Sequence, residues 1–287
     1  VNSEDFEEAY KYKEVIFISP SNANPEIKNN TISIGISLES QLNSLKDFIN
    51  TMKKNKTIIL YPRNEYSDFI EKKINKIKFK NVKLFEYSPD PKVLTGEIEK
   101  LTNYSQRKRN LELRKKMLAD KDDYQSINEL KKLEHIYTLG KVEFDSIIVI
   151  DFGSSLKSVL TSFVFSDVSE KDVIFTTVNQ WFDQSIFFEN SLKTLYYPSI
   201  NYKNFNNYNN KYAKAFDSQP SEITILTYDA IGLIYYIWKK NNKIISIKDF
   251  LIKDQIKGKI GTFSFSSNQV LQKLDIYKAE NKKFTKF

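Results

Sequence analysis

The stretch SIIVIDFGSSLKSVLTSFVF, residues 146–165, joins an apolar run directly to a helical pattern. Residues 146–150 are mostly β-branched and uncharged, which is typical of a strand buried on both faces of a parallel sheet. Ser154 is the expected N-cap of the helix that follows. The inner face of this helix is predicted from apolar residues at helical spacing: Leu156, Val159, Leu160 and Phe163. A buried strand that leads straight into a helix predicts a βα unit.

The same alternation extends along the chain. Six other apolar runs are predicted strands: Val15–Ile18, Thr31–Ile36, Thr57–Tyr61, Val82–Tyr87, Val173–Thr177 and Leu192–Tyr197. Further stripes at helical spacing begin at Leu38, Phe69, Phe205 and Ala230. This order predicts an α/β fold with parallel sheets, and the length of 287 residues suits two domains.

One predicted connection is unusually long. The stretch Pro91–Leu139 is about twice as long as a plain crossover helix requires, and its two helical runs are separated by Ala119–Asp123. The sequence therefore predicts an inserted helical hairpin, with Gly140 helping to end its second arm. Its basic segment, Arg107–Lys116, lacks interleaved aromatic residues and is interpreted as a solvated face, so no nucleic acid is expected as a partner.

The composition excludes several kinds of site. The chain has no cysteine, which excludes disulfides, zinc–thiolate sites and a cysteine nucleophile. The single histidine, His135, lies in the predicted hairpin, and no glycine-rich phosphate loop is present. No run of about 18 uncharged apolar residues predicts a membrane span. The net charge of +8 comes mostly from dispersed lysines, interpreted as solvated surface. We expect no catalytic activity, no cofactor and no metal site.

The tripeptide Asp151-Phe152-Gly153 matches a metal-binding motif of protein kinases, but the other kinase motifs are missing. Its position is more informative, because it follows a predicted strand and precedes a predicted helix. In open α/β sheets, ligands bind beyond the carboxyl ends of strands and beside helix N-termini. Asp151 and Gly153 are therefore candidate ligand contacts. An equally good alternative is that Asp151 only caps the following helix.

Three other strand ends carry candidate ligand-binding side chains: Ser19, Ser21 and Asn22 after the first strand, Tyr66 after the third, and Gln180 and Trp181 after the sixth. Hydroxyl and amide groups can bind a carboxylate or hydroxyl ligand, and an exposed tryptophan offers a stacking surface. An ordinary polar turn is the alternative for Ser19 to Asn22. The alternative for Trp181 is a side chain that only fills space in the hydrophobic core.

Several of these segments resemble a known family. The motif TYDA, residues 227–230, opens an apolar helix and is followed by GKIGTFSF, residues 258–265. This order resembles the closing part of type I periplasmic binding proteins of the leucine/isoleucine/valine-binding kind. The segments ISPS, residues 18–21, and ILYPRNEY, residues 59–66, resemble that family's first-lobe turn and second-lobe strand.

A narrower resemblance involves the predicted hairpin. The motifs YSPD, LE, TLG and FDSI, which begin at residues 87, 133, 138 and 144, resemble the penicillin-binding-protein activator branch. Members of that branch are envelope lipoproteins that stimulate peptidoglycan synthases. The resemblance implies a periplasmic protein that acts by binding a peptidoglycan synthase, with a lipid anchor on the full-length protein. The alternative is a solute-binding protein of an ABC transporter for amino acids.

The resemblance also implies a domain organisation of two Rossmann-like lobes. Lobe 1 would comprise residues 1–38 and 199–265, and lobe 2 residues 39–198 and 266–287, with the helical hairpin inserted at residues 91–139. The family has about two βα units before its Ser-rich turn, whereas this chain has about fourteen residues there. Lobe 1 is therefore expected to be truncated at its N-terminus.

Overall fold

A computed structural model of the chain describes residues 11–12, 14–20, 30–179, 192–244, 246–259, 261–281 and 283–287. The chain divides into two compact units. Unit 1 comprises Val1–Asp47, Pro198–Tyr277 and Lys286–Phe287, and unit 2 comprises Phe48–Tyr197 and Lys278–Thr285. Both units therefore combine segments that are far apart in the sequence.

Unit 2 is built on a seven-stranded sheet with the order β12-β11-β7-β6-β5-β3-β4. Its strands in chain order are β3 (Thr57–Pro62), β4 (Val82–Tyr87), β5 (Ser146–Val149), β6 (Ile174–Thr177), β7 (Thr194–Ser199), β11 (Asp275–Glu280) and β12 (Lys283–Lys286). The pairings from β4 through β3, β5 and β6 to β7 are all parallel. The parallel arrangement predicted from the sequence is confirmed.

The core of unit 2 lies on the central strands. Every residue of β3, β5 and β6 is buried, as expected for strands covered on both faces. Helix α7 (Gly153–Phe165) packs its predicted apolar face inward, and its Phe163 ring meets Phe144 and Phe175 edge-on, at centroid distances of 6.2 and 5.8 Å. The other helices of unit 2 include α3 (Ser67–Lys76) and α4 (Pro91–Leu101). Helix α2 (Leu38–Thr51) begins in unit 1 and ends in unit 2.

One detail of α7 differs from the sequence prediction. Phe152, with extended backbone angles of −132° and 155°, occupies the N-cap, and no side chain caps the helix. Ser154 lies within the first turn, so its prediction as the cap is wrong. Gly153, the first residue of the helix, has a φ of +56°, a left-handed conformation that glycine tolerates at no steric cost.

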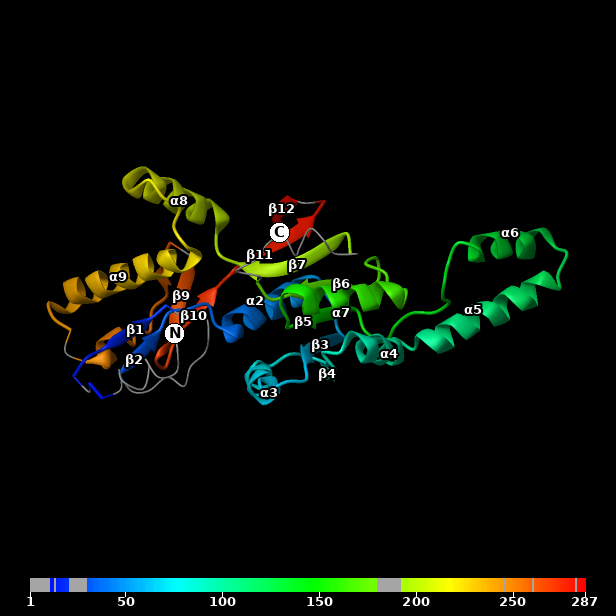
Figure 1. The fold of residues 1–287 in the computed structure, drawn as a ribbon, viewed down its shortest axis with the longest axis horizontal. Helices are drawn as coiled ribbons and strands as arrows, with labels where there is room; N and C mark the ends of the chain where they lie inside the picture. The colour runs from blue at the N-terminus through cyan, green and yellow to red at the C-terminus, as the bar shows by residue number, and fades with distance from the viewer. Residues whose placement is uncertain are drawn as a thin grey trace. The chain divides into compact units, whose positions relative to one another are not determined.

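The predicted insertion is a three-helix segment in which α4 is the crossover helix itself. The hairpin consists of α5 (Tyr104–Ala119) and α6 (Tyr124–Leu133), which lie beside each other and project away from the sheet of unit 2 (Figure 1). The turn between them falls where the sequence predicts it. Asp123 caps α6, because its carboxylate accepts hydrogen bonds from the backbone N–H of Ser126 at 2.9 Å and from its hydroxyl at 2.6 Å.

Unit 1 contains a five-stranded sheet with the order β1-β2-β10-β9-β8. Its elements are β1 (Phe17–Ser19), β2 (Thr31–Ser33), α8 (Tyr202–Phe216), α9 (Glu222–Asn241), the 3₁₀ helix η2 (Ile247–Phe250), β8 (Ile256–Lys257), β9 (Thr262–Ser266) and β10 (Gln269–Lys273). The pairs β1–β2 and β2–β10 are parallel, whereas β10–β9 and β9–β8 are antiparallel. The three antiparallel strands lie outside the strands predicted from the sequence.

The helices of unit 1 bury less than their patterns predict. Helix α8 has no buried residue, so the prediction of an inner face starting at Phe205 is wrong. Helix α9 buries Ala230, Leu233 and Ile237, but Ile234 is 39% exposed. The stripe on α8 includes Tyr208 and Tyr212, and a tyrosine can remain partly exposed because its ring is apolar while its hydroxyl prefers water.

Candidate functional site

The carboxyl ends of the strands in unit 2 bring Tyr87 and Asp151 together. Strands β4 and β5 flank β3, and Tyr87 is the last residue of β4, paired in register with Pro62. Ile150 continues from β5 by donating its N–H to the carbonyl of Leu60, at 2.8 Å. Asp151 follows, and the hydroxyl of Tyr87 donates a hydrogen bond to Asp151 Oδ2. This pair spans the carboxyl end of β3.

The other oxygen of Asp151 also has a partner, since Oδ1 accepts the N–H of Phe152 at 2.7 Å. Burial raises the pKa of Asp151 above its ordinary value, and the hydrogen bonds from Tyr87 and Phe152 partly offset that rise. Burial and the adjacent Asp151 carboxylate both raise the pKa of Tyr87. The phenol therefore stays neutral and acts as a donor, and the carboxylate is held as an acceptor for groups of this chain.

A second internal network lies at the ends of β3 and β4. Arg63 forms an ion pair with Glu86 at 3.2 Å and another with Glu97 at 3.6 Å. Glu97 Oε2 also accepts the N–H of Ser88, at 2.7 Å. Arg63, Glu86 and Glu97 are thus paired with one another within unit 2. Such pairs are partly exposed and position the strand ends more than they stabilise the fold.

Three of the predicted ligand contacts lie on this edge of unit 2. Asp151 and Gly153 follow β5, and Tyr66 precedes α3 with a side chain that is 58% exposed. The alternative that Asp151 caps the following helix is wrong, although its carboxylate does accept the backbone N–H of Phe152 just before α7. Asp151 is not the N-cap residue, which is Phe152.

The other predicted contacts fall elsewhere. Ser19 is the last residue of β1 in unit 1 and is buried, and its carbonyl accepts the N–H of Ile34 at 2.9 Å. The remaining four candidates lie outside the described residues: Ser21, Asn22, Gln180 and Trp181. His135 is exposed after α6.

The α5–α6 hairpin has its own small core and a buried anchor that the sequence analysis missed. Its core cluster consists of Leu111, Leu118 and Leu133, with Leu130 and Leu139 packed against it. Arg107, within the segment interpreted as a solvated face, is only 7% exposed, so that interpretation is wrong at this position. A usable signal was present, since Arg107 shares a helical face with Leu111 and Leu118.

Arg107 fixes the base of the hairpin. Its guanidinium donates to the carbonyl oxygens of Gly140, Ser166 and Asp167, at 3.2, 3.0 and 2.7 Å. It also donates to the hydroxyl of Thr138 at 2.7 Å, and that hydroxyl donates to Asp167 Oδ2 at 2.6 Å. Burial lowers the pKa of Arg107, opposed by the nearby Asp167 carboxylate. The guanidinium remains charged and has a structural role.

The described residues contain no cluster of three or more metal-ligating His, Cys, Asp or Glu side chains. In the same part of the chain, no helix has both the length and the apolar character that crossing a bilayer requires.

No protein-family profile matches the chain, and no curated protein matches its sequence. Solved structures do match. One is a Rhodospirillum rubrum protein named as a branched-chain amino acid ABC transporter, with a TM-score of 0.63, 8% identity, and coverage of 97% of this chain and 74% of that one. Another is an ABC transporter substrate-binding protein from Desulfitobacterium hafniense, with a TM-score of 0.61, 12% identity, and coverage of 98% and 75%.

A third match is the C-domain of LpoA from Haemophilus influenzae, described as a regulator of PBP1A, with a TM-score of 0.55, 9% identity, and coverage of 100% and 80%. The chain spans less than half of some matches: 47% of full-length LpoA and 45% of an extracellular ligand-binding receptor from Desulfohalobium retbaense. At these identities, the likeness shows the fold alone. The chain has the fold of type I periplasmic binding proteins, as the resemblance in its sequence predicts.

Proposed function

We propose that this chain is a non-enzymatic binding module of the bacterial envelope, and that it acts by binding a protein partner, a peptidoglycan synthase. The observation that carries the proposal is the hydrogen bond from Tyr87 to Asp151. A site for a free amino acid needs a carboxylate that can pair with the ligand's ammonium group. Here both carboxylate oxygens of Asp151 accept hydrogen bonds, from Tyr87 and Phe152, which favours a structural role for Asp151 over ligand binding.

The α5–α6 hairpin supplies the surface that we assign to the partner. Leu113 and Met117 lie one turn apart on α5, on the side opposite Leu111 and Leu118, and are 48% and 60% exposed. A pair of large apolar side chains on a projecting helix can anchor a protein interface, whose energy is concentrated in a few such residues. The synthase as partner is supported by the shared fold with LpoA, which is described as a regulator of PBP1A.

A binding experiment tests this assignment. A peptidoglycan synthase of the PBP1A kind is immobilised, and the affinity of the chain is measured with and without the double substitution Leu113→Glu and Met117→Glu. We expect the double variant to lose at least about tenfold in affinity, because charge at a desolvated apolar contact is costly. Val93→Glu, at an exposed position on α4 outside the hairpin, is the matched control and should bind normally.

Failure of the unmodified chain to bind the synthase would contradict the proposal. Equal losses of affinity in the double variant and in Val93→Glu would instead show that the hairpin is not the binding surface. Turnover of any substrate, traced to residues of this chain, would contradict the non-enzymatic part.

The second candidate is an amino-acid-binding protein of an ABC transporter. It is favoured by the exposed Tyr66 ring and by Asp151, which both lie at the carboxyl edge of the unit 2 sheet. A thermal-shift screen of amino acids separates the two candidates, because a ligand at 100 times its Kd stabilises a protein by about 2.7 kcal/mol. A clear rise in Tm with one amino acid, lost in Asp151→Asn, would favour transport.

A further inference from the structure

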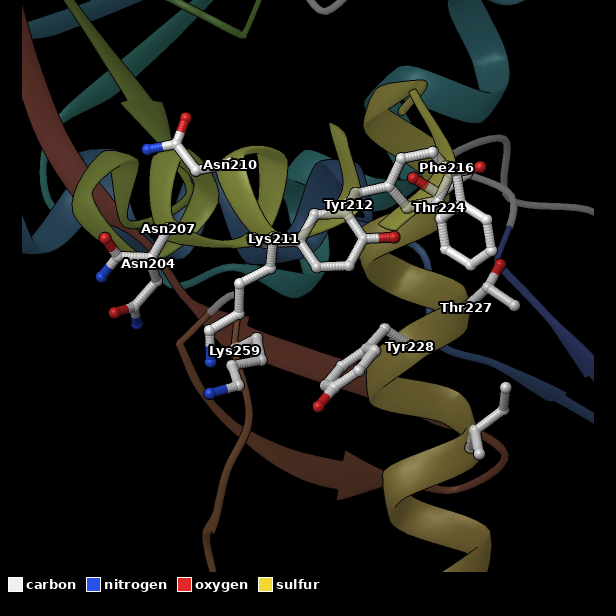
Figure 2. A pocket seen from close by; sticks show the side chains of 12 residues that line it. Asn204, Asn207, Asn210, Lys211, Tyr212, Phe216, Thr224, Thr227, Tyr228 and Lys259 are labelled. Atoms are coloured by element: carbon white, nitrogen blue, oxygen red, sulfur yellow. The ribbon is translucent and has the colours of Figure 1, made fainter. Parts of the chain in front are cut away.

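A groove in unit 1 lies between α8 and α9 and has a volume of about 810 Å³ (Figure 2). We call it the α8–α9 groove. One wall is α8, which has no buried residue, and the other is the N-terminal half of α9. The loop before β9 contributes Lys259. The groove is therefore made by side chains that the fold of unit 1 leaves uncovered.

Aromatic rings line the groove along α8. Tyr208, Tyr212 and Phe216 follow one another at intervals of four residues, with ring centroids 6.0 and 4.7 Å apart. From α9, Tyr228 meets the Tyr208 ring edge-on at 5.7 Å. Figure 2 shows Tyr212, Phe216 and Tyr228 gathered around the same space. These rings offer apolar faces on which a flat or ring-shaped ligand can pack.

Amide side chains follow the aromatic row. Asn204, Asn207 and Asn210 lie on α8 and line the groove (Figure 2). No described residue forms a hydrogen bond with the side-chain amide of any of these three asparagines. Each amide can both donate and accept, which matches a ligand rich in hydroxyl groups. From Asn204 to Phe216, the wall is about 18 Å long at 1.5 Å per residue, which suits an oligomer better than a single small ring.

The groove is also cationic. Among the described residues that line it, the charged ones are Lys211 and Lys259, and none is Asp or Glu. Neither ammonium group forms an ion pair with any described residue. Figure 2 shows both lysine side chains extending toward the same end of the groove. Two neighbouring cations without counter-charges repel each other, and an anionic ligand would relieve that repulsion.

The position of Lys259 is fixed from behind. Its backbone N–H donates to Asp229 Oδ1 at 2.8 Å, and Asp229 is buried on α9. Gly258 leaves no room for a side chain there, since a Cβ would lie 2.5 Å from Asp229 Oδ2. The loop is therefore held against α9, which keeps Lys259 at the groove.

We propose that the α8–α9 groove binds an acidic saccharide. The rings would pack against the apolar faces of the sugar units, the asparagines would bind hydroxyl groups, and Lys211 and Lys259 would bind the acid. Proteins that bind single-stranded nucleic acid also use aromatic stacking and cationic side chains, but their grooves carry positive charge along the whole phosphate backbone. The described lining residues include two lysines, three asparagines and no arginine, which fits a polyhydroxylated ligand with few charges better.

Isothermal titration calorimetry on the whole chain tests the proposal with defined probes. The acidic probes are tri-galacturonic acid and the disaccharide of N-acetylglucosamine and N-acetylmuramic acid. The neutral probe is chitotriose, and a deoxythymidine hexamer represents nucleic acid. We expect at least one acidic saccharide to bind, and chitotriose to bind about tenfold more weakly or not at all.

Variants assign the binding to this groove. Lys211→Gln and Lys259→Gln should each weaken the acidic probe about tenfold, and Tyr212→Ala should weaken it similarly. Lys214→Gln, on the same helix but outside the groove lining, is the matched control and should leave the affinity unchanged. The Tm of each variant shows whether it remains folded. Because Lys211 is exposed, we expect Lys211→Gln to remain folded.

Three results would overturn the proposal. These are no binding of either acidic saccharide, equal binding of the neutral probe, or tighter binding of the hexamer with a steep salt dependence. The outcome is independent of the hairpin experiment, because every groove residue lies in unit 1 and the hairpin lies in unit 2.

Discussion

The guanidinium of Arg107 donates a hydrogen bond of 2.7 Å to the backbone carbonyl of Asp167, sixty residues further along the chain. Arg107 lies in the first turn of α5 and Asp167 follows the last turn of α7, so this bond connects the hairpin to the rest of unit 2. The neighbouring carbonyl of Ser166 accepts a second bond from the same group. The carbonyl oxygens at the end of α7 therefore obtain their hydrogen-bond donors from the inserted hairpin.

Arg107→Ala should destabilise the protein by about 3 kcal/mol, because it leaves buried carbonyl oxygens without donors. Arg109→Ala, two residues further along the same helix and exposed, is the matched control and should change stability by less than about 0.5 kcal/mol. Urea denaturation followed by circular dichroism measures both. Equal effects of the two substitutions would show that the buried network does not stabilise the hairpin.

Tyr87→Phe should produce a pH-dependent loss of stability. Burial raises the folded pKa of Asp151, so the folded state keeps a proton at pH values where the unfolded state has lost it. The free energy of unfolding therefore falls as the pH rises from the ordinary range of an aspartate to the raised value. Removal of the Tyr87 hydroxyl raises that pKa further, so the substitution should cost little near about pH 4 and about 1–2 kcal/mol near pH 7.

Denaturation at both pH values checks this prediction. Tyr61→Phe is the control, because Tyr61 is also buried, on the adjacent strand β3, and its hydroxyl forms no hydrogen bond with a described residue. It should not produce the same pH dependence. A cost for Tyr87→Phe that is the same at both pH values would show that Asp151 does not depend on the phenol.

Two glycine substitutions in unit 1 should have opposite signs. Gly232→Ala should stabilise the protein by about 0.5–1 kcal/mol, because Gly232 lies inside α9 with no atom within 4 Å of an added Cβ. Gly258→Ala should destabilise it by about 1–3 kcal/mol, because the new Cβ would press on the buried carboxylate of Asp229. Thermal and urea unfolding compare the pair, and a stabilising Gly258→Ala would argue against the close packing of this loop.

Asp123→Ala should lower the Tm at neutral pH by removing the cap of α6. Hydrogen bonds from the Ser126 hydroxyl and backbone N–H lower the pKa of Asp123. The stabilisation is therefore present above the ordinary pKa of an aspartate and is lost as the pH falls through the lowered folded value. The difference in Tm between the parent and variant should shrink in strong acid. Asp122→Ala, one residue before the cap, should show neither effect.

The strand pattern of unit 2 could be predicted because its cause is local. A strand covered on both faces needs a nearly continuous apolar run, and residues 57–61, 146–150 and 173–177 supply such runs. The hairpin turn could be predicted for the same reason, since Ala119–Asp123 interrupts two helical patterns. The strand-end rule also placed Asp151, Gly153 and Tyr66 at the carboxyl edge of the unit 2 sheet.

The amino-acid sequence by itself thus determined the α/β class, the parallel central strands and the position of the insertion. Only the tertiary structure decided what Arg107, Asp151 and the stripe on α8 are used for. Arg107 and Asp151 find partners 60 and 64 residues away, and α8 has no buried residue although Tyr228 of α9 contacts its Tyr208 ring. Local periodicity reports which side of an element is apolar, whereas burial and hydrogen bonding depend on what the rest of the chain brings to that side.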